Sequence, residues 1–375
     1  MDLVLSADQK LLHSTVKSFL EKEAPLTKVR EMADAQVGFE RDWWGRAAEL
    51  GCAAMLVPEE LGGGSVSGKG LLDLVIVAEE FGRGVAPGPL PATNIVLAGL
   101  VESVEGPDHS VAVQALAAGE SVATWAVYEP GRQWHPLAPA LTAEASGDGF
   151  VLDGVKDRVE LAEQADLLLV TAMAPGGLTQ FLVPTDSPGV TVVPTRSLDL
   201  VRRLAEVRFS RVEVPATAVV GAVGGAGPAV ERQLQVAVVL QCAETCGAVD
   251  RAFEFTVQWA FDRFSFGRPL ASYQALKHRF ADMKTWLEAC HATTSAAAHA
   301  VQDRADDAAE LVSVAKSYVG SRSTDILQDC VQMHGGIGVT WEHDLHLYLR
   351  RATVNRALYG TPEDHRLRIA DIVAL

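Results

Sequence analysis

One uninterrupted helical run dominates the second half of this chain. The segment PAVERQLQVAVVLQCAETCGAVDRAFEFTVQWAFDR, residues 228–263, contains no proline after its first position. A helix of about 35 residues spans roughly 50 Å at 1.5 Å per residue. Two more long helical patterns follow, at about 272–301 and 306–333. Helices of this length bury their apolar faces best against one another, so we expect a four-helix bundle.

The rest of the chain divides by the period of its apolar residues. Residues 1–117 repeat every three to four positions, and Ser6 with Gln9 forms a capping-box pattern at the first helix. From 118 to 215 the period shortens to two, in short segments rich in β-branched residues. We therefore expect an α+β fold with an N-terminal α-helical domain (1–117), a middle antiparallel β-domain of about six or seven strands (118–215) and a C-terminal α-helical bundle domain (216–375).

The chain is strongly acidic, with 32 Lys and Arg against 48 Asp and Glu and a formal net charge of −16. Such a surface repels nucleic acids and anionic membranes, so we expect neither as a partner. The first residues lack a basic stretch followed by an apolar run, and no segment approaches the roughly 18 apolar residues that a membrane span needs. We expect a cytoplasmic protein.

Two turns between the long helices carry the residues of chemical interest. RFSFG closes the first long helix, where Gly267 supplies a left-handed cap and Arg263 interacts favourably with the helix dipole. The functional alternative is that Arg263 meets a phosphate while Phe266 covers an aromatic ring. QMHGGIG joins two later helices through Gly335 and Gly336, which either form a simple turn or let the backbone approach a ligand closely.

In this order and spacing, the two turns resemble those of the acyl-CoA dehydrogenase family. Members of that family end a helix with Arg-x-x-Phe-Gly, place a Gln eleven residues after the Arg and carry a later Gln-x-x-Gly-Gly. The matching residues here are Arg263, Phe266, Gly267, Gln274, Gln332, Gly335 and Gly336. The resemblance extends over nearly the whole chain and includes EEFGRGVAPGPLPAT before the β-domain and GVKDRVELAEQADLLLV within it.

The resemblance implies a flavoprotein that binds FAD and an acyl-CoA thioester. In such enzymes a carboxylate removes the α-proton, the flavin accepts the β-hydride to leave a 2-enoyl-CoA, and an electron-transfer flavoprotein reoxidises the flavin. Each FAD lies across a subunit interface, and one subunit holds its adenosine diphosphate half. In this chain Arg263 would pair with the pyrophosphate and Ser265 would donate a hydrogen bond. The residues around the adenosine portion would be Phe266, Gln274, Gln332, Gly335 and Gly336.

The residues that would surround the flavin ring differ from the family pattern. Family members cradle the ring with a Thr-Glu-Pro-Gly-x-Gly-Ser-Asp-like loop, and with an aromatic and a hydroxyl residue after a Gly-x-Lys strand. Here the loop reads YEPGRQWHP, which keeps Glu129 but lacks Gly-Ser-Asp. Arg158 and Glu160 occupy the aromatic and hydroxyl positions. These replacements argue against a normal ring site in this chain.

The usual catalytic base is also missing. Many members have a Tyr-Glu-Gly-Thr-like turn whose Glu is the base, whereas RALYGT puts Tyr359 at that position. A phenol with a pKa of about 10 is a poor base at neutral pH. Some relatives carry the carboxylate on the long helix, at a position that corresponds roughly to Ala237. Glu244, seven residues further along, is the candidate replacement, because burial would raise its pKa, and a structural or partner-facing role is the alternative.

Three hypotheses follow from the resemblance. In the first, the chain is the accessory subunit of an α2β2 heterotetrameric acyl-CoA dehydrogenase and donates the adenosine half-site to a partner subunit that carries the base. In the second, it is a self-sufficient homotetrameric enzyme that uses Glu244. In the third, it is a non-enzymatic acyl-CoA-binding or assembly protein with this fold. Heteromeric members suggest bulky acyl-CoAs, such as those with steroid side chains. The spacing of His334, His343 and His346 matches no metal motif, so we expect no metal.

Overall fold

The structure is a computed structural model that describes residues 5–103 and 105–374. It begins with helices: α1 (Ala7–Glu23), α2 (Leu26–Asp34), α3 (Arg41–Glu49), α4 (Gly70–Gly84), α5 (Leu90–Glu102) and α6 (Ser110–Ala117). Strands follow: β1 (Ala123–Ala126), β2 (Thr142–Ser146), β3 (Gly149–Glu160), β4 (Leu167–Ala174), β5 (Gly177–Pro184), β6 (Val190–Thr195), β7 (Leu204–Pro215) and β8 (Val219–Val220). The C-terminal helices are α7 (Gly227–Asp262), α8 (Gln274–Gln302), α9 (Ala308–His334), α10 (Leu345–Ala357) and α11 (Pro362–Ile372). The α+β class predicted from the sequence is confirmed.

The strands form one sheet in the order β6-β7-β3-β2-β4-β5-β8, with β1 beside β4. Most pairings are antiparallel, as expected from the period of two. Strands β1 and β2 pair with β4 in parallel, so the sheet is mixed and not purely antiparallel. The limits expected for separate domains, at residues 117 and 215, stay a prediction.

Helix α7 is the axis of the C-terminal bundle and packs against α4, α5, α8, α9 and α10. Its approach to α4 is unusually close because two glycines face the crossing. A Cβ on Gly82 of α4 would lie 1.8 Å from the carbonyl oxygen of Glu244, and a Cβ on Gly247 of α7 would lie 1.9 Å from that of Glu79. The two backbones therefore touch, and the side chains of α7 near Glu244 are sealed from solvent.

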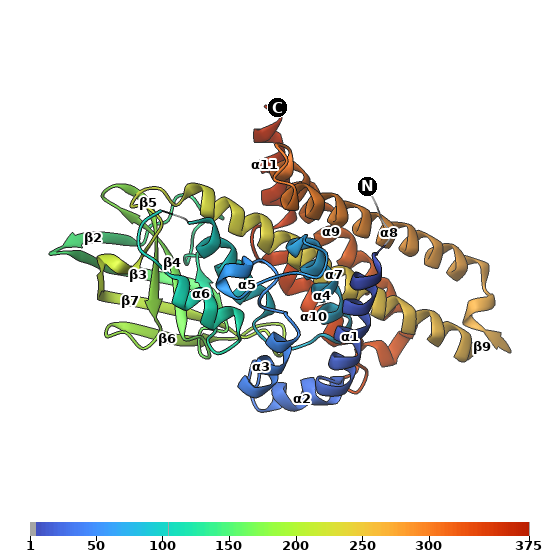
Figure 1. Cartoon of the computed structure of the whole chain (residues 1–375). Coiled ribbons are helices and arrows are strands. Elements are labelled where there is room, and N and C mark those ends of the chain that lie inside the picture. The colour runs from blue at the N-terminus through green and yellow to red at the C-terminus, as the bar shows by residue number, and fades with distance from the viewer. Residues whose placement is uncertain (1–4, 104, 375) are drawn as a thin grey trace.

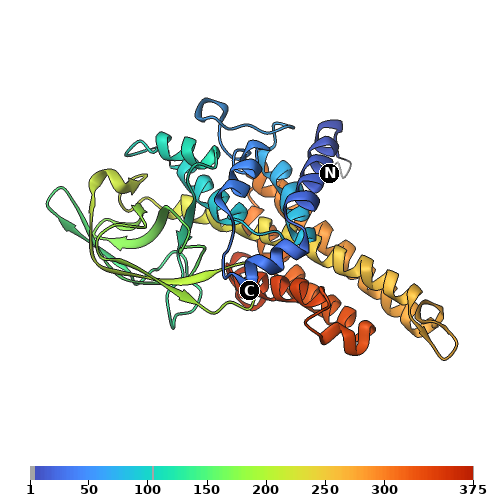
Figure 2. The same cartoon turned by 90° about the horizontal axis from the view of Figure 1, so that it is seen from below.

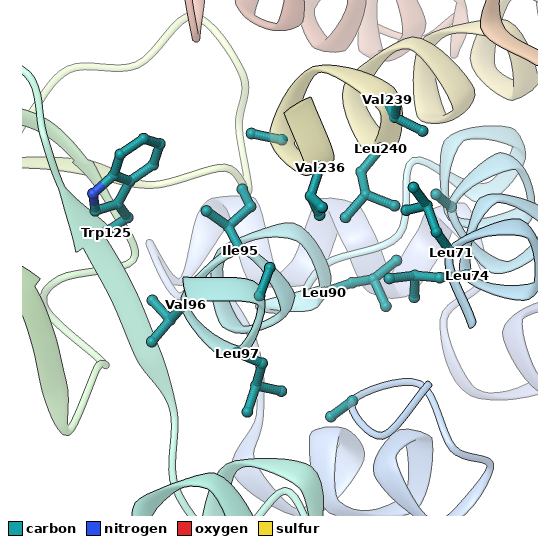
Figure 3. Close-up of a cluster of buried hydrophobic side chains, with 14 of the residues drawn as sticks. Leu71, Leu74, Leu90, Ile95, Val96, Leu97, Trp125, Val236, Val239 and Leu240 are labelled. Atoms are coloured by element: carbon teal, nitrogen blue, oxygen red, sulfur yellow. The ribbon is translucent and has the colours of Figure 1, made fainter. Parts of the chain in front are cut away.

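The main hydrophobic core joins the N-terminal helices to the bundle and the sheet. Figure 3 shows α5 at its centre, with side chains that point to α4, α7 and β1. The labelled residues are buried: Leu71, Leu74, Leu90, Ile95, Val96, Leu97, Trp125, Val236, Val239 and Leu240. This packing stabilises the seam between the sheet and the bundle, which is where the residues expected at the flavin ring lie.

The sheet and the α7–α8 connection occupy opposite ends of the molecule. In Figures 1 and 2, strands β2 to β7 lie at one end, and the paired helices α7 and α8 project from the other end with β9 (Phe264–Ser265) at their tip. The two halves of the predicted flavin site are therefore far apart within one chain.

Within residues 5–103 and 105–374, no helix has the length and apolarity to cross a membrane.

Candidate functional site

The α7–α8 connection presents the predicted phosphate-binding turn. Two-residue strands β9 (Phe264–Ser265) and β10 (Arg268–Pro269) pair with each other. Between them Phe266 and Gly267 have φ values of 50° and 78°, the left-handed conformation that a tight turn requires. The Phe266 side chain is 97% exposed, and Arg263 is exposed as well. The turn therefore presents an arginine and a phenyl ring to solvent.

The predicted Gln-x-x-Gly-Gly turn lies beside this connection. Trp259, on the last turn of α7, stacks on His334 at the end of α9, with ring centroids 5.3 Å apart. Gln332 is exposed, and a Cβ built on Gly335 or Gly336 would meet nothing within 4 Å. Gln274, the first residue of α8, is exposed at the same end of the bundle. The structure thus brings the predicted adenosine-side residues to one open surface.

Arg263 is available for an external anion. It makes no ion pair with any residue in the described ranges, and its guanidinium lies 5.9 Å from the Trp259 ring. The turn is fixed by the Tyr273 hydroxyl, which donates to the carbonyl of Ser265 at 2.8 Å. The exposed Arg263 guanidinium, the Ser265 side-chain hydroxyl and the open backbone at Gly335 and Gly336 are donors of the kinds that suit a pyrophosphate. These residues fit the phosphate side of FAD.

Tyr359 lies at the other half of the predicted flavin site, at the seam between the sheet and the bundle, and it is buried within an aromatic cluster. Its ring stacks on Trp125 at 5.9 Å and meets Tyr128 and Trp134 at 6.0 and 6.5 Å between centroids. The Tyr359 backbone N–H donates to the Tyr128 phenol oxygen. Burial, and then the nearby Glu160 carboxylate, raise the pKa of Tyr359 well above its ordinary value. The phenol is therefore neutral at physiological pH and cannot act as a base.

The turn that contains Tyr359 is held by buried hydrogen bonds. The Lys316 ammonium donates to the carbonyl oxygens of Asn355 and Leu358, at 2.5 and 2.7 Å. Burial lowers the pKa of Lys316 to about 8. His365 Nε2 lies 2.8 Å from the Tyr359 carbonyl, and burial lowers the pKa of His365 to about 4. A neutral His365 therefore donates from Nε2, and the turn has little freedom to move.

A chain of buried ion pairs lies next to the aromatic cluster. Arg202 Nε lies 3.1 Å from Glu160, and its Nη2 lies 2.8 Å from Glu244. Arg351 Nη1 lies 2.6 Å from Glu244, and Arg351 Nε also pairs with Asp199. All five residues are buried, at 4% exposure or less. Three carboxylates therefore face two guanidiniums, and Glu160 is at one end with its Oε2 unpaired.

The pKa of Glu244 differs from the expectation. We expected burial to raise it into the range of a catalytic base. Burial does raise it, but the charges of Arg202 and Arg351 and the hydrogen bond from Asn355 outweigh that effect and hold the pKa of Glu244 below its ordinary value. The carboxylate is ionised and already accepts hydrogen bonds at both oxygens. It fixes the Arg202 and Arg351 guanidiniums in place.

At the altered loop, which we expect not to form a normal ring site, Glu129, Trp134 and Arg158 make their contacts within this chain. Glu129 is buried and accepts hydrogen bonds from the backbone N–H groups of Ala140 and Leu141 and from Lys156 Nζ, at 2.7–2.9 Å. The Trp134 ring lies 4.7 Å from that of Tyr128. The guanidinium carbon of Arg158 lies over the Tyr128 ring, 4.3 Å from its centroid.

A cavity of only about 20 Å³ remains beside this loop, lined by Tyr128, Trp134 and Arg158 among others. That volume is close to the space of a single water molecule. A flavin ring needs far more, so the residues present do not fit the ring half of FAD in this conformation.

Sequence reasoning missed the residues that complete the ion-pair chain and the aromatic cluster. These are Asp199, Arg202, Arg351, Asn355, Lys316, Tyr128 and Trp134. One signal was available: the pairs Arg202–Arg203 and Arg350–Arg351 each sit in an otherwise apolar stretch, VRRLA and LYLRRA. In both pairs one arginine is buried and the other lies nearer to solvent.

This chain is similar to known proteins along nearly its whole length. Residues 6–105, 124–212 and 225–374 match the N-terminal, middle and C-terminal domains of acyl-CoA dehydrogenase. Acyl-CoA dehydrogenase IpdE2 of Mycobacterium tuberculosis is 32% identical over 95% of this chain and 94% of its own length. IpdE2 of Mycolicibacterium smegmatis is 30% identical over 97% and 98% of the two chains.

Among solved structures, a variant of the Tcur3481-Tcur3483 steroid ACAD has a TM-score of 0.87 and 27% identity, over 98% of this chain and 97% of its own. Enzymes with this set of domains are FAD-dependent oxidoreductases that act on CH–CH groups. The chain belongs to the acyl-CoA dehydrogenase family.

Proposed function

We propose that this chain is the accessory subunit of an α2β2 acyl-CoA dehydrogenase. The complex dehydrogenates an acyl-CoA thioester at its α and β carbons, and an electron-transfer flavoprotein accepts the electrons. This chain supplies the adenosine diphosphate half of the FAD site, through Arg263, Ser265, Phe266, Gln274, Gln332, Gly335 and Gly336. The partner subunit supplies the flavin-ring site and the carboxylate base.

The contrast between the two half-sites carries the proposal. At the α7–α8 tip, Arg263 is unpaired among the described residues and Phe266 is almost fully exposed, which leaves them unused within a single chain. At the seam between sheet and bundle, Tyr359 stands in the place of the base, and the cavity lined by Tyr128, Trp134 and Arg158 among others has a volume of about 20 Å³. A chain that offers one half of a cofactor site and closes the other half is suited to a partner with an open ring site.

We further propose a bulky acyl-CoA, such as one with a steroid side chain, as the substrate. The support is the likeness to the solved steroid ACAD, whose name joins two proteins, Tcur3481 and Tcur3483. The partner's pocket would set the acyl specificity, because this chain's own seam is filled by aromatic rings.

Glu244 has a structural role in this proposal. Its carboxylate is ionised and bound by two arginines and an asparagine, so abstraction of a proton from carbon would require it to leave these partners. The alternatives are a self-sufficient enzyme that uses Glu244 and a non-enzymatic protein with this fold.

The test is the FAD content of the purified protein, alone and co-expressed with a partner. The partners to try are acyl-CoA dehydrogenase chains of the source organism that carry a glutamate at the position of Tyr359. We expect no flavin on this chain alone and one FAD per pair in the complex. Arg263→Ala should remove the flavin from the complex, while Lys284→Ala, an exposed cation already paired with Glu288, should keep it.

The alternatives give different results. About one FAD per chain in the protein alone, with acyl-CoA oxidation that Glu244→Gln abolishes, would establish the self-sufficient enzyme. No FAD with any partner, combined with acyl-CoA binding, would establish the non-enzymatic protein. Flavin retained in the Arg263→Ala complex would remove this residue from the cofactor site.

A further inference from the structure

The adenosine half-site is built from two turns that are far apart in the sequence. Arg263 follows the last residue of α7, whereas Gly335 and Gly336 follow α9. Within residues 5–103 and 105–374, no hydrogen bond joins Arg263 to either glycine. A ligand that spans both turns binds more tightly when their spacing is fixed beforehand. The contact that sets this spacing therefore affects affinity.

One indole ring lies between the two turns. Trp259 is one helical turn before Arg263, and its ring centroid is 5.9 Å from the Arg263 guanidinium carbon, within the reach of a cation–π contact. The same ring stacks on His334, the residue directly before Gly335, with centroids 5.3 Å apart and the two planes 19° apart. Trp259 therefore connects the arginine of one turn to the start of the other.

His334 is a fixed support for this ring. It is 5% exposed, and its Nδ1 donates to the Cys330 carbonyl oxygen at 2.8 Å. The rings of Phe255 and His343 pack edge-on against it, with centroids 5.8 and 4.5 Å away. Burial lowers the pKa of His334, which keeps the ring neutral at physiological pH. Gly335 follows with φ of 64° and ψ of −139°, so the glycine turn starts from a side chain that is held in place.

The Arg263 side chain depends on Trp259 for its support. The neighbouring Asp262 carboxylate accepts from the Gln258 amide at 3.1 Å, and the Arg263 guanidinium has no hydrogen bond or ion pair with the described residues. Trp259 contributes only the face of its ring, because its Nε1 has no hydrogen-bond partner in the described part of the chain. A smaller planar ring can therefore replace it in part.

We infer that Trp259 is a positioning residue of the adenosine half-site. Its ring holds the Arg263 guanidinium at a fixed distance from the backbone of Gly335 and Gly336, so that one adenosine diphosphate group can contact both turns. The ring acts through Arg263 and His334 and does not itself need to touch the ligand. This inference rests on the proposed function and adds the residue that keeps the two turns in register.

The test uses the complex of this chain with its partner dehydrogenase and three probes: FAD, ADP and riboflavin. Flavin fluorescence measures the affinity for FAD, and competition with FAD measures the other two. Trp259→Leu should weaken FAD and ADP by about tenfold, the combined effect of a stacked pair and a cation–π contact, and change riboflavin by less than about twofold. Trp259→Phe keeps a planar ring and should hold ADP within about threefold of the native complex.

Trp286 provides the matched control. It also lies against arginines, with the guanidinium carbons of Arg279 and Arg322 each 4.9 Å from its ring, but it is about three helical turns beyond Gln274 on α8. Trp286→Leu should leave the affinities for all three probes unchanged. His334→Ala is a second variant, because it removes the support of the ring and leaves Trp259 in place. It should weaken ADP severalfold and leave riboflavin unchanged.

The outcomes separate this inference from the proposed function. If Arg263→Ala weakens FAD, while Trp259→Leu and His334→Ala bind ADP as tightly as Trp286→Leu, the half-site stands and the inference is overturned. It is also overturned if Trp259→Leu weakens ADP and riboflavin alike, or if Trp259→Phe is as weak as Trp259→Leu, because the ring then has only a structural role.

Two further results are decisive. If Trp259→Leu does not fold, the ADP and riboflavin affinities of His334→Ala and Trp259→Phe decide by the same criteria. If the complex contains no FAD, or if Arg263→Ala leaves its affinity for FAD unchanged, the proposed half-site is wrong and the inference falls with it.

Discussion

Arg202 donates from a single nitrogen, Nη2, to both carboxylate oxygens of Glu244, at 2.8 and 3.0 Å, and both side chains are at least 96% buried. A charge pair this deep is sustained only if each group has further partners. Arg202 also binds Glu160, and Glu244 also binds Arg351. The pair is therefore the middle of a continuous ionic chain that runs along the closed seam between the sheet and the bundle.

Removal of Arg202 should be strongly destabilising. Arg202→Leu leaves buried Glu160 without an ion-pair partner and leaves Glu244 with only one of its two arginines. We therefore expect the free energy of unfolding to fall by about 3–5 kcal/mol. Arg203→Leu is the matched control, because Arg203 pairs with Glu163 at 3.3 Å near the surface and should cost less than about 1 kcal/mol. Urea denaturation of the purified chain measures both. Equal losses in the two variants would contradict a stabilising ionic chain.

Glu160 should make stability fall as pH rises. Burial raises its pKa above the ordinary value of 4.5, against the opposing charge of Arg202. The contribution of this group is therefore fully present below pH 4.5 and is lost as pH rises through the folded-state pKa.

The variant that isolates this effect is Glu160→Gln, whose amide oxygen can still accept from Arg202. The difference in unfolding free energy between the native protein and this variant should decline by up to about 1.4 kcal/mol per pH unit above pH 4.5. The surface control, Glu163→Gln, should show no comparable decline. A difference that is flat with pH would mean that Glu160 titrates normally.

The sequence predicted the fold well because its signals are local. The 36 residues of α7 carry no internal proline beyond the first turn, and the capping box at Ser6 forms as expected, with the Gln9 N–H donating to Ser6 Oγ at 3.1 Å. Arg158 and Glu160 also pointed to the altered seam. The ion-pair chain could not be predicted, because Arg202, Glu244 and Arg351 come from a loop and two helices that only the tertiary fold brings together.

The pKa expected for Glu244 was wrong for the same reason. From the apolar run around it, only the burial effect was visible, and the two arginines that reverse it are 42 and 107 residues away. Tyr359 was placed correctly in the turn, but nothing in RALYGT indicated that Trp125, Tyr128 and Trp134 would enclose its ring.

His365 should destabilise the chain in acid. Burial lowers its pKa from 6.5 to about 4, so the folded state holds it neutral with Nε2 bonded to the Tyr359 carbonyl. A histidine with a lowered pKa contributes stability that is present above pH 6.5 and is lost as pH falls towards 4.

Relative to His365→Asn, which keeps a donor, the native protein should lose unfolding free energy over this interval. His278→Asn, at an exposed position on α8, should show no such change, and a pH-independent difference for His365 would refute the assignment.

Restoring the family's glutamate should not restore a catalytic site. Tyr359→Glu puts a carboxylate into an aromatic cluster and next to Glu160, and it removes the ring that stacks on Trp125. We expect a loss of at least about 3 kcal/mol of unfolding free energy, from the lost packing and the buried charge.

We also expect no bound flavin and no acyl-CoA-dependent reduction of an acceptor dye in Tyr359→Glu, because the cavity beside the ring is too small for a flavin. Tyr359→Phe, which keeps the stack, should lie within about 1 kcal/mol of the native protein. A stable Tyr359→Glu protein that binds FAD alone would show that the seam opens readily, and that the tyrosine alone separates this chain from a self-sufficient dehydrogenase.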